Sequence, residues 1–255
     1  MQLSELNAIV TGGASGLGEA TTRKIVASAG KVAIFDLNEE RASSLIDELG
    51  QHNAVFFKTD VTSPEQVEGN TKKVYETFGS INALVNCAGV ATPGKVHGKK
   101  GMMKLEAFEK VVRINLIGTF NVIRVATSYM RENNPVEGER GVIINTASAA
   151  AFEGQIGQAA YSASKGGVAS MTLPLAREFA SVGIRVMAIA PGLFETPMFD
   201  TLPEAAKEGL GKMVPFPNRL GIPSEYAALM ESILTNPMLN GEVIRLDGAI
   251  RMQPK

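Results

Sequence analysis

Short runs of apolar and β-branched residues alternate with helix-length amphipathic segments along the whole chain of 255 residues. Most of these runs are continuously apolar, which is the pattern of strands that are covered on both faces. Strand, helix and strand repeated in this way predict right-handed crossovers and a parallel sheet. The expected strands are 7–11, 31–36, 54–60, 83–89, 141–148, 184–192 and 242–248.

The sequence therefore predicts an α/β fold: a Rossmann-type, doubly wound parallel sheet of about seven strands with helices on both faces. No linker, low-complexity tract or internal repeat divides the chain, so we expect residues 1–255 to form a single domain. Its cofactor half is expected at about residues 1–140, and its catalytic and substrate half at about residues 141–255.

Between the strands, one helix has readable ends, with Ser63 as its cap and Gly79 as its stop. Three other segments interrupt the alternation. Residues 91–103 and 132–141 are polar loops that contain glycine and proline, and residues 194–221 are too many for a simple connection. Long connections of this kind in compact domains are usually functional, as lids or substrate loops.

Composition excludes several classes of protein. A formal net charge of -1 and a pI near 6.2 argue against nucleic acid or a membrane surface as the main partner. The single cysteine, Cys87, excludes an internal disulfide, and with only His52 and His97 no metal site is expected. No apolar run is long enough to span a bilayer, and the first strand begins almost at once, so we expect a cytoplasmic protein.

A glycine-rich loop, "TGGASGLG" at 11–18, follows the first strand and opens a helix. Its spaced glycines are Gly12, Gly16 and Gly18, which differ from the G-x-G-x-x-G pattern. Glycine lets the backbone turn sharply and approach a pyrophosphate, while the helix N-terminus offers free N–H groups to the anion. A plain strand-to-helix turn is the alternative interpretation.

Asp36 ends the second strand, where a carboxylate can accept hydrogen bonds from both ribose hydroxyls of an adenosine and repel a 2′-phosphate. No basic residue stands beside it, because Leu37 follows it and Ser15 precedes Gly16 in the glycine loop. The sequence therefore favours NAD over NADP. A cap for the following helix is the structural alternative for Asp36.

The ends of the third and fourth strands supply further candidates. Asp60 and Val61 can meet the adenine, although the Asp60 carboxylate can equally cap the next helix. "NCAG" at 86–89 ends the fourth strand with small residues, as packing against a cofactor requires. Within it, Cys87 is interpreted as a buried filler rather than a nucleophile, since no histidine is placed to activate it.

"YSASK" at 161–165 places Tyr161 and Lys165 four residues apart, on one face of a helix. A cation at that spacing favours the phenolate, so we expect Lys165 to lower the tyrosine pKa and make Tyr161 an acid or base for an alcohol and carbonyl pair. Taken alone, this pattern also fits an amphipathic surface tyrosine beside a solvated lysine. Ser148, at the end of the fifth strand, and Asn115, inside an apolar helix, favour the catalytic interpretation.

These motifs together resemble the short-chain dehydrogenase/reductase family. "TGGASGLG", "NCAG", Asn115, Ser148, "YSASK" and "PGLFET" follow the order and spacing of that family over the whole chain. "IRVMAIAPGLFETPMF", "VPFPNRLG" and "NGEVIRLDGAIRMQP" are similar to its subfamily of type 2 3-hydroxyacyl-CoA dehydrogenases, also called 17β-hydroxysteroid dehydrogenase type 10. The loops 91–103 and 132–141 look like insertions of that subfamily.

The resemblance implies an NAD-dependent homotetramer that oxidises 3-hydroxyacyl-CoA thioesters, as in fatty acid β-oxidation or branched-chain acyl-CoA degradation. It implies that Tyr161 is the general base, that Lys165 lowers its pKa and binds the nicotinamide ribose, and that Ser148 orients the substrate oxygen. Asn115 then supports a proton relay, and Gln158 is a substrate-side amide. The implied NAD contacts are Ser15, Leu17, Asp36, Asp60, Val61, Cys87, Phe194 and Thr196, alongside Gly12, Gly16, Gly18 and Gly89.

Two alternatives stay open at this point. The same scaffold can serve an NAD-linked dehydrogenase of another secondary alcohol, such as a hydroxysteroid. A non-catalytic NAD-binding scaffold subunit belongs to a different class, since folds are reused without their chemistry. The intact set of Asn115, Ser148, Tyr161 and Lys165 argues against the scaffold. The lysines of "GKVHGKKGMMK" can meet CoA phosphates, but a charged loop of this kind is usually just solvated.

Overall fold

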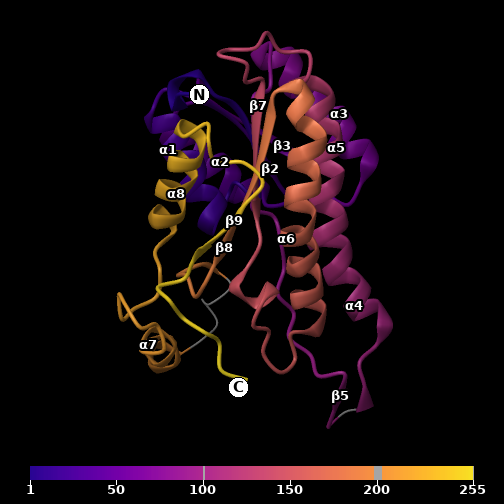
Figure 1. Cartoon of the computed structure of the whole chain (residues 1–255), viewed down its shortest axis with the longest axis vertical. Coiled ribbons are helices and arrows are strands. Elements are labelled where there is room, and N and C mark those ends of the chain that lie inside the picture. Colours follow the sequence, from indigo (N-terminus) through magenta and orange to yellow (C-terminus); the bar gives the residue numbers. More distant parts are fainter. Residues whose placement is uncertain (100, 198–202, 255) are drawn as a thin grey trace.

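The computed structural model describes residues 1–99, 101–197 and 203–254. It confirms the predicted α/β fold, because parallel strands form one sheet in the order β3-β2-β1-β4-β7-β8-β9 with helices on both faces (Figure 1). The strands are β1 (Asn7–Thr11), β2 (Lys31–Asp36), β3 (Ala54–Lys58), β4 (Ala83–Asn86), β7 (Gly141–Thr146), β8 (Ile184–Pro191) and β9 (Val243–Leu246). The helices are α1 (Gly16–Ala27), α2 (Glu39–Leu49), α3 (Pro64–Phe78), α4 (Leu105–Val112), α5 (Thr119–Met130), α6 (Ala159–Phe179), α7 (Glu204–Gly211) and α8 (Pro223–Thr235).

The expected elements occur where the sequence placed them, but several strands end earlier. β3 stops at Lys58 and β4 at Asn86, two and three residues before the apolar runs end. Apolar continuity does not mark where ladder hydrogen bonds stop, and the residues beyond these two strands leave the sheet and enter the site. The ends of α3 are as expected: the Ser63 hydroxyl accepts from Gln66 N at 3.3 Å, and Gly79 adopts φ +79°.

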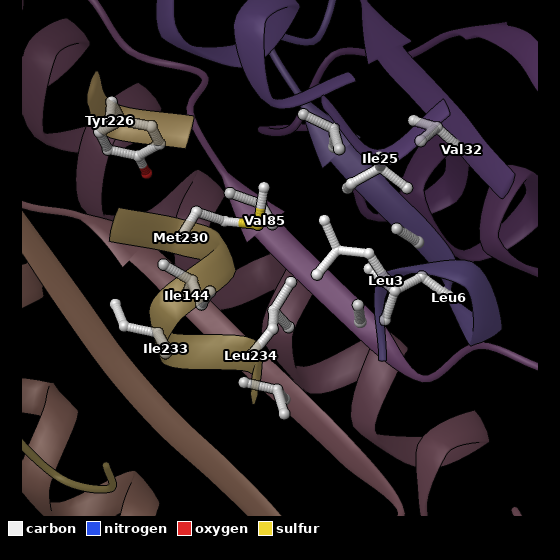
Figure 2. Close-up of a cluster of buried hydrophobic side chains, with 14 of the residues drawn as sticks. Leu3, Leu6, Ile25, Val32, Val85, Ile144, Tyr226, Met230, Ile233 and Leu234 are labelled. Atoms are coloured by element: carbon white, nitrogen blue, oxygen red, sulfur yellow. The ribbon is translucent and has the colours of Figure 1, made fainter. Parts of the chain in front are cut away.

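Buried apolar side chains form a separate layer on each face of the sheet. Along β1, Val10 belongs to the layer under α1, α2 and α8, and Ile9 belongs to the layer under α3, α5 and α6. Figure 2 shows the first layer, with Tyr226, Met230 and other α8 side chains lying near those of the central strands. Burial on both faces explains why the strands read as continuous apolar runs.

The strand order reverses at β1, which has β2 on one side and β4 on the other. At such a reversal the connecting loops diverge and leave a crevice at the carboxyl ends of the strands. β1 and β4 are in close register, with Thr11 opposite Asn86, so Gly12 meets the residues after β4. A Cβ on Gly12 would lie 2.9 Å from both N and Cα of Ala88, and only glycine allows this approach.

The interrupting segments carry small elements of their own. The loop 91–103 contains a hairpin of β5 (His97–Gly98) and β6 (Gly101–Met102), and 132–141 contains a bridge between Val136 and Glu139. The segment 194–221 contains α7, and its residues 198–202 lie outside the described part of the chain. The β5 hairpin, α7 and the C-terminus lie towards one end of the molecule (Figure 1). Across the described residues, no helix combines the length and the apolar character needed to cross a membrane.

Candidate active site

A pocket of about 1100 Å³ lies at the carboxyl ends of the central strands, around the reversal between β1 and β4. Asn115 lies behind its wall, and all the other candidate residues line it. Those lining residues are Gly12, Ser15, Gly16, Leu17, Gly18, Asp36, Asp60, Val61, Cys87, Gly89, Ser148, Gln158, Tyr161, Lys165, Phe194 and Thr196. Residues spread over most of the chain therefore meet in one cavity, as the sequence predicts.

The glycine loop and the start of α1 form one part of the pocket. Gly12 has φ +63°, and a Cβ on Gly18 would fall 2.1 Å from the Gly12 carbonyl oxygen, so the loop folds closely on itself. Ser15 is the N-cap residue of α1, but its side chain makes no capping hydrogen bond. The N–H groups of the first helical turn are thus left uncapped by a side chain, and a helix N-terminus with open donors suits a pyrophosphate.

The Asp36 carboxylate is fixed by two backbone amides at the end of β2. It accepts from Ala14 N at 3.1 Å and from Asn38 N at 3.0 Å. The cap of α2 is Asn38, whose side chain accepts from Arg41 N at 3.0 Å, so the interpretation of Asp36 as the helix cap is wrong. The carboxylate is instead held in the pocket wall and ties the glycine loop to β2.

Asp60 stabilises the turn that follows β3. Its carboxylate accepts from both the backbone N (2.9 Å) and the hydroxyl (2.8 Å) of Thr62, while the cap of α3 is Ser63. The helix-cap alternative for Asp60 is therefore wrong, since its carboxylate bonds the turn before the helix and Ser63 caps the helix. Val61 is buried beside it, and its carbonyl accepts from Asn121 Nδ2 at 2.8 Å.

Tyr161 and Lys165 both lie in the first turns of α6; Tyr161 is half-buried in the pocket wall, and Lys165 is buried. Lys165 is 5% exposed, its Nζ donates to the Thr146 carbonyl at 2.7 Å, and burial lowers its pKa to about 8. Burial raises the pKa of the Tyr161 phenol, and the Ser148 hydroxyl acts in the opposite direction. The expectation that Lys165 lowers the tyrosine pKa is thus wrong for the chain alone, because desolvation dominates and the ammonium is engaged with Thr146.

Ser148 and Gln158 flank Tyr161 in the pocket wall. The Ser148 oxygen accepts from Ala150 N at 3.1 Å, which caps the short 3₁₀ helix Ala149–Ala151 and leaves the hydroxyl free to donate. The Gln158 amide is folded onto Gln155, accepting from its backbone N at 3.0 Å. Both side chains are therefore oriented by their own local backbone.

Asn115 lies on a π-helical turn, Arg113–Gly118, that joins α4 to α5. Its amide accepts from Val90 N at 2.8 Å and donates to Val90 O at 2.9 Å and to the Ser164 hydroxyl at 3.0 Å. The helix in which the sequence places Asn115 is interrupted here by the π turn, and the amide is bonded to the backbone of Val90. Asn115 thereby ties the chain after β4 to α6.

Some lining residues carry no signal in the sequence. Glu106, Glu109, Lys110 and Arg113 reach the pocket from α4 and the π turn, and Met252 reaches it from the C-terminal segment. Tertiary packing brings them in, and no motif spacing marks them. At Cys87, burial raises the pKa of the thiol, which fits the interpretation as a buried filler.

Comparison with known proteins identifies the family of the chain. Residues 6–207 match the sequence profile described as short chain dehydrogenase. The chain is 54% identical over 252 residues to the 3-hydroxyacyl-CoA dehydrogenase type-2 of Homo sapiens, covering 98% of this chain and 96% of that protein. It is 36% identical over 247 residues to the ipsdienol dehydrogenase of Ips pini, covering 95% and 96%.

A solved structure gives the same result for the fold. The crystal structure of 3-hydroxyacyl-CoA dehydrogenase type-2 from Mycobacterium avium superimposes with a TM-score of 0.90 at 41% sequence identity. The match covers 97% of this chain and 96% of that one. The predicted motifs, the fold and these similarities agree, and the chain belongs to the short chain dehydrogenase family.

Proposed function

We propose that this oxidoreductase interconverts 3-hydroxyacyl-CoA and 3-oxoacyl-CoA thioesters with NAD as its cofactor. The observation that carries the proposal is the single pocket in which Asp36, the glycine loop, Ser148 and Tyr161 meet. Near-full-length similarity to proteins named 3-hydroxyacyl-CoA dehydrogenase type-2 supports the substrate class.

The pocket fits a nicotinamide dinucleotide. The close packing of Gly12 and Gly18 leaves the backbone exposed to a pyrophosphate at the uncapped start of α1. The Asp36 carboxylate is oriented by two amides towards the place where an adenosine ribose would lie, and its neighbours Phe35 and Leu37 carry no positive charge. When bound, NAD would supply the hydride acceptor for the carbinol carbon.

Tyr161 and Ser148 carry the proton chemistry. The Ser148 hydroxyl, already accepting from Ala150 N, donates to the substrate oxygen and orients it. In reduction the Tyr161 Oη gives its proton to that oxygen, and in oxidation Tyr161 Oη removes the hydroxyl proton. Because burial raises its pKa in the chain alone, Tyr161 is a neutral phenol at pH 7 and starts as an acid, which suits the reduction direction.

Lys165 and Asn115 position these groups. With a pKa of about 8, Lys165 is mostly protonated at pH 7 and presents a buried positive charge one helical turn from Tyr161. Asn115 fixes Ser164 and the backbone of Val90, so the strand end and α6 keep a constant separation. We assign Asn115 to the support of a proton relay to Lys165, as the family resemblance implies.

We also propose that the protein is a homotetramer. Ile117 lies on the π turn and is 53% exposed, and Phe120 lies on α5 and is 48% exposed. Leu173 on α6 is 43% exposed. Phe152 and Ile156, near the C-terminal segment, are also exposed. Apolar surface of this kind on several elements supports more than one contact between copies.

The first prediction tests the reaction and its acid/base group together. The wild type should reduce acetoacetyl-CoA with NADH at least tenfold more efficiently, in kcat/KM, than it oxidises a hydroxysteroid with NAD. Tyr161→Phe removes only the hydroxyl, so kcat should fall by roughly 10²- to 10⁴-fold while the Kd of NADH stays within about threefold. Steady-state kinetics and NADH fluorescence titration provide both values.

Tyr129→Phe is the matched control, because Tyr129 packs against Tyr75 on α3 and does not line the pocket. Its kinetics should equal those of the wild type. Faster turnover of the steroid would favour the alternative secondary-alcohol dehydrogenase. NADH binding without any turnover would favour the scaffold, and a Tyr161→Phe protein with substantial activity would show that the proton leaves by another route.

The second prediction concerns the cofactor. Asp36→Ala removes the ribose acceptor and the charge that opposes a 2′-phosphate, so the preference for NADH over NADPH should fall at least tenfold, or about 1.4 kcal/mol. Asp60→Ala, which removes another carboxylate from the same pocket, should change this ratio far less. The measurement is kcat/KM with each nucleotide. Comparable wild-type values for NADH and NADPH would refute NAD specificity.

The third prediction concerns assembly. Light scattering should give a mass near four times 27.0 kDa at micromolar concentration. Phe120→Glu should weaken the assembly, because it places a charge in an apolar contact. Met238→Glu, at a position 90% exposed just after α8, is the control and should leave the mass unchanged. A stable monomer of the wild type would contradict the proposal.

A further inference from the structure

A ring of three polar groups lies at the ends of β4 and β7, where Cys87 and Thr146 line the pocket and Tyr226 is buried behind them. The Tyr226 hydroxyl lies 2.8 Å from Thr146 Oγ1, and Cys87 Sγ lies 3.7 Å from each of these oxygens. The thiol donates to Tyr226 and the Thr146 hydroxyl donates to the thiol, which leaves the Tyr226 hydroxyl to donate to Thr146. Each group thus donates once and accepts once, and the ring is closed.

The ring is connected directly to the proposed catalytic lysine. Thr146 is the last residue of β7, and its carbonyl oxygen accepts from Lys165 Nζ at 2.7 Å. Tyr226 belongs to the apolar layer under α8, whereas Lys165 extends from α6. One residue of the central sheet therefore bonds the tyrosine through its side chain and the lysine through its backbone.

Apart from its hydroxyl, the Tyr226 side chain packs in an apolar layer. The side chain is 0% exposed and packs among Met230 and other apolar residues of the layer drawn in Figure 2. Phenylalanine would fill the same space without the cost of burying a hydroxyl, a cost that is offset only if the group is hydrogen-bonded. Burial raises the Tyr226 pKa well above its usual value, so the group remains a neutral donor across the working pH range.

We propose that Tyr226 is a positioning residue for Lys165, acting through Thr146. By fixing the Thr146 side chain, its hydroxyl fixes the end of β7 and therefore the carbonyl that holds the lysine ammonium. This role rests on the proposed function, in which Lys165 works beside Tyr161. The titratable groups around the ammonium are Tyr161 on α6, Cys87 after β4 and, one contact further, Tyr226 on α8.

The first experiment follows Lys165 itself and needs no turnover. Lysines labelled with 13C at Cε are titrated by NMR in the protein without cofactor, with Lys165→Met assigning the signal. In the wild type the Lys165 midpoint should lie near pH 8. Tyr226→Phe should lower that midpoint by about half a unit or more, because a displaced carbonyl stabilises the charged form less. Thr146→Val should do the same, and Thr146→Ser, which retains the oxygen, should restore the wild-type value.

The second experiment measures kinetics on the same variants. Tyr226→Phe and Thr146→Val should each lower kcat about three- to tenfold, with the KM for acetoacetyl-CoA within twofold. The double variant should be no worse than the poorer single variant, because both changes break one path. Tyr129→Phe, a phenol outside the pocket and the ring, should change neither the midpoint nor kcat.

The outcomes separate the two proposals. Circular dichroism shows which of Tyr226→Phe and Thr146→Val folds. If the Lys165 midpoint does not move in a variant that folds, the positioning role is overturned, even if kcat falls. A shifted midpoint that Thr146→Ser restores supports it. If the wild type turns over no 3-oxoacyl-CoA, the proposed function fails, and the titration still decides the role of Tyr226.

Discussion

The bond between the Lys165 ammonium and the Thr146 carbonyl is the contact on which the arrangement of the site depends. A lysine is almost never fully buried without a partner, because removing its charge from water is costly. Here the side chain is 5% exposed and its partner is a backbone oxygen at 2.7 Å. Burial lowers the pKa to about 8, so the charge is retained at neutral pH, although the fold is less stable for it. The contact joins α6, which also carries Tyr161, to the end of β7.

The sheet supplies that contact through its topology. Parallel strands all end at one edge, and the reversal between β1 and β4 opens a crevice there. Chain just beyond each strand supplies one component: the glycine loop after β1, Asp36 at the end of β2, Asp60 after β3, Cys87 after β4 and Ser148 after β7. Because the two apolar layers fix the strands on both faces, these short segments converge without large loops of their own.

Motif residues were predictable because their chemistry depends on local spacing. Tyr161 and Lys165 share a helix, and Gly12 and Gly18 share one loop. The strands begin where runs of apolar residues begin. The pKa values of those residues were not predictable, because they depend on burial by distant segments. The Tyr161 pKa rises instead of falling for that reason. The arrival of Met252 in the pocket likewise arises from packing that no motif encodes. Capping by Asn38 rather than Asp36 is different, because it is a local bond made by a residue type that is common at helix N-caps.

The pH dependence of unfolding, compared between the wild type and Lys165→Met at one fixed protein concentration, tests the central contact most directly. The folded-state pKa of about 8 lies below the value of 10.5 for a free lysine, so the unfolded chain keeps the proton longer as pH rises. Below pH 8 the penalty for the buried charge is fully present, and it disappears between pH 8 and 10.5. The free energy of unfolding of the wild type, relative to Lys165→Met, should therefore rise by roughly 3 kcal/mol across that window. A difference that stays constant from pH 7 to 10.5 would contradict the account, because it would show that Lys165 is not a buried charge.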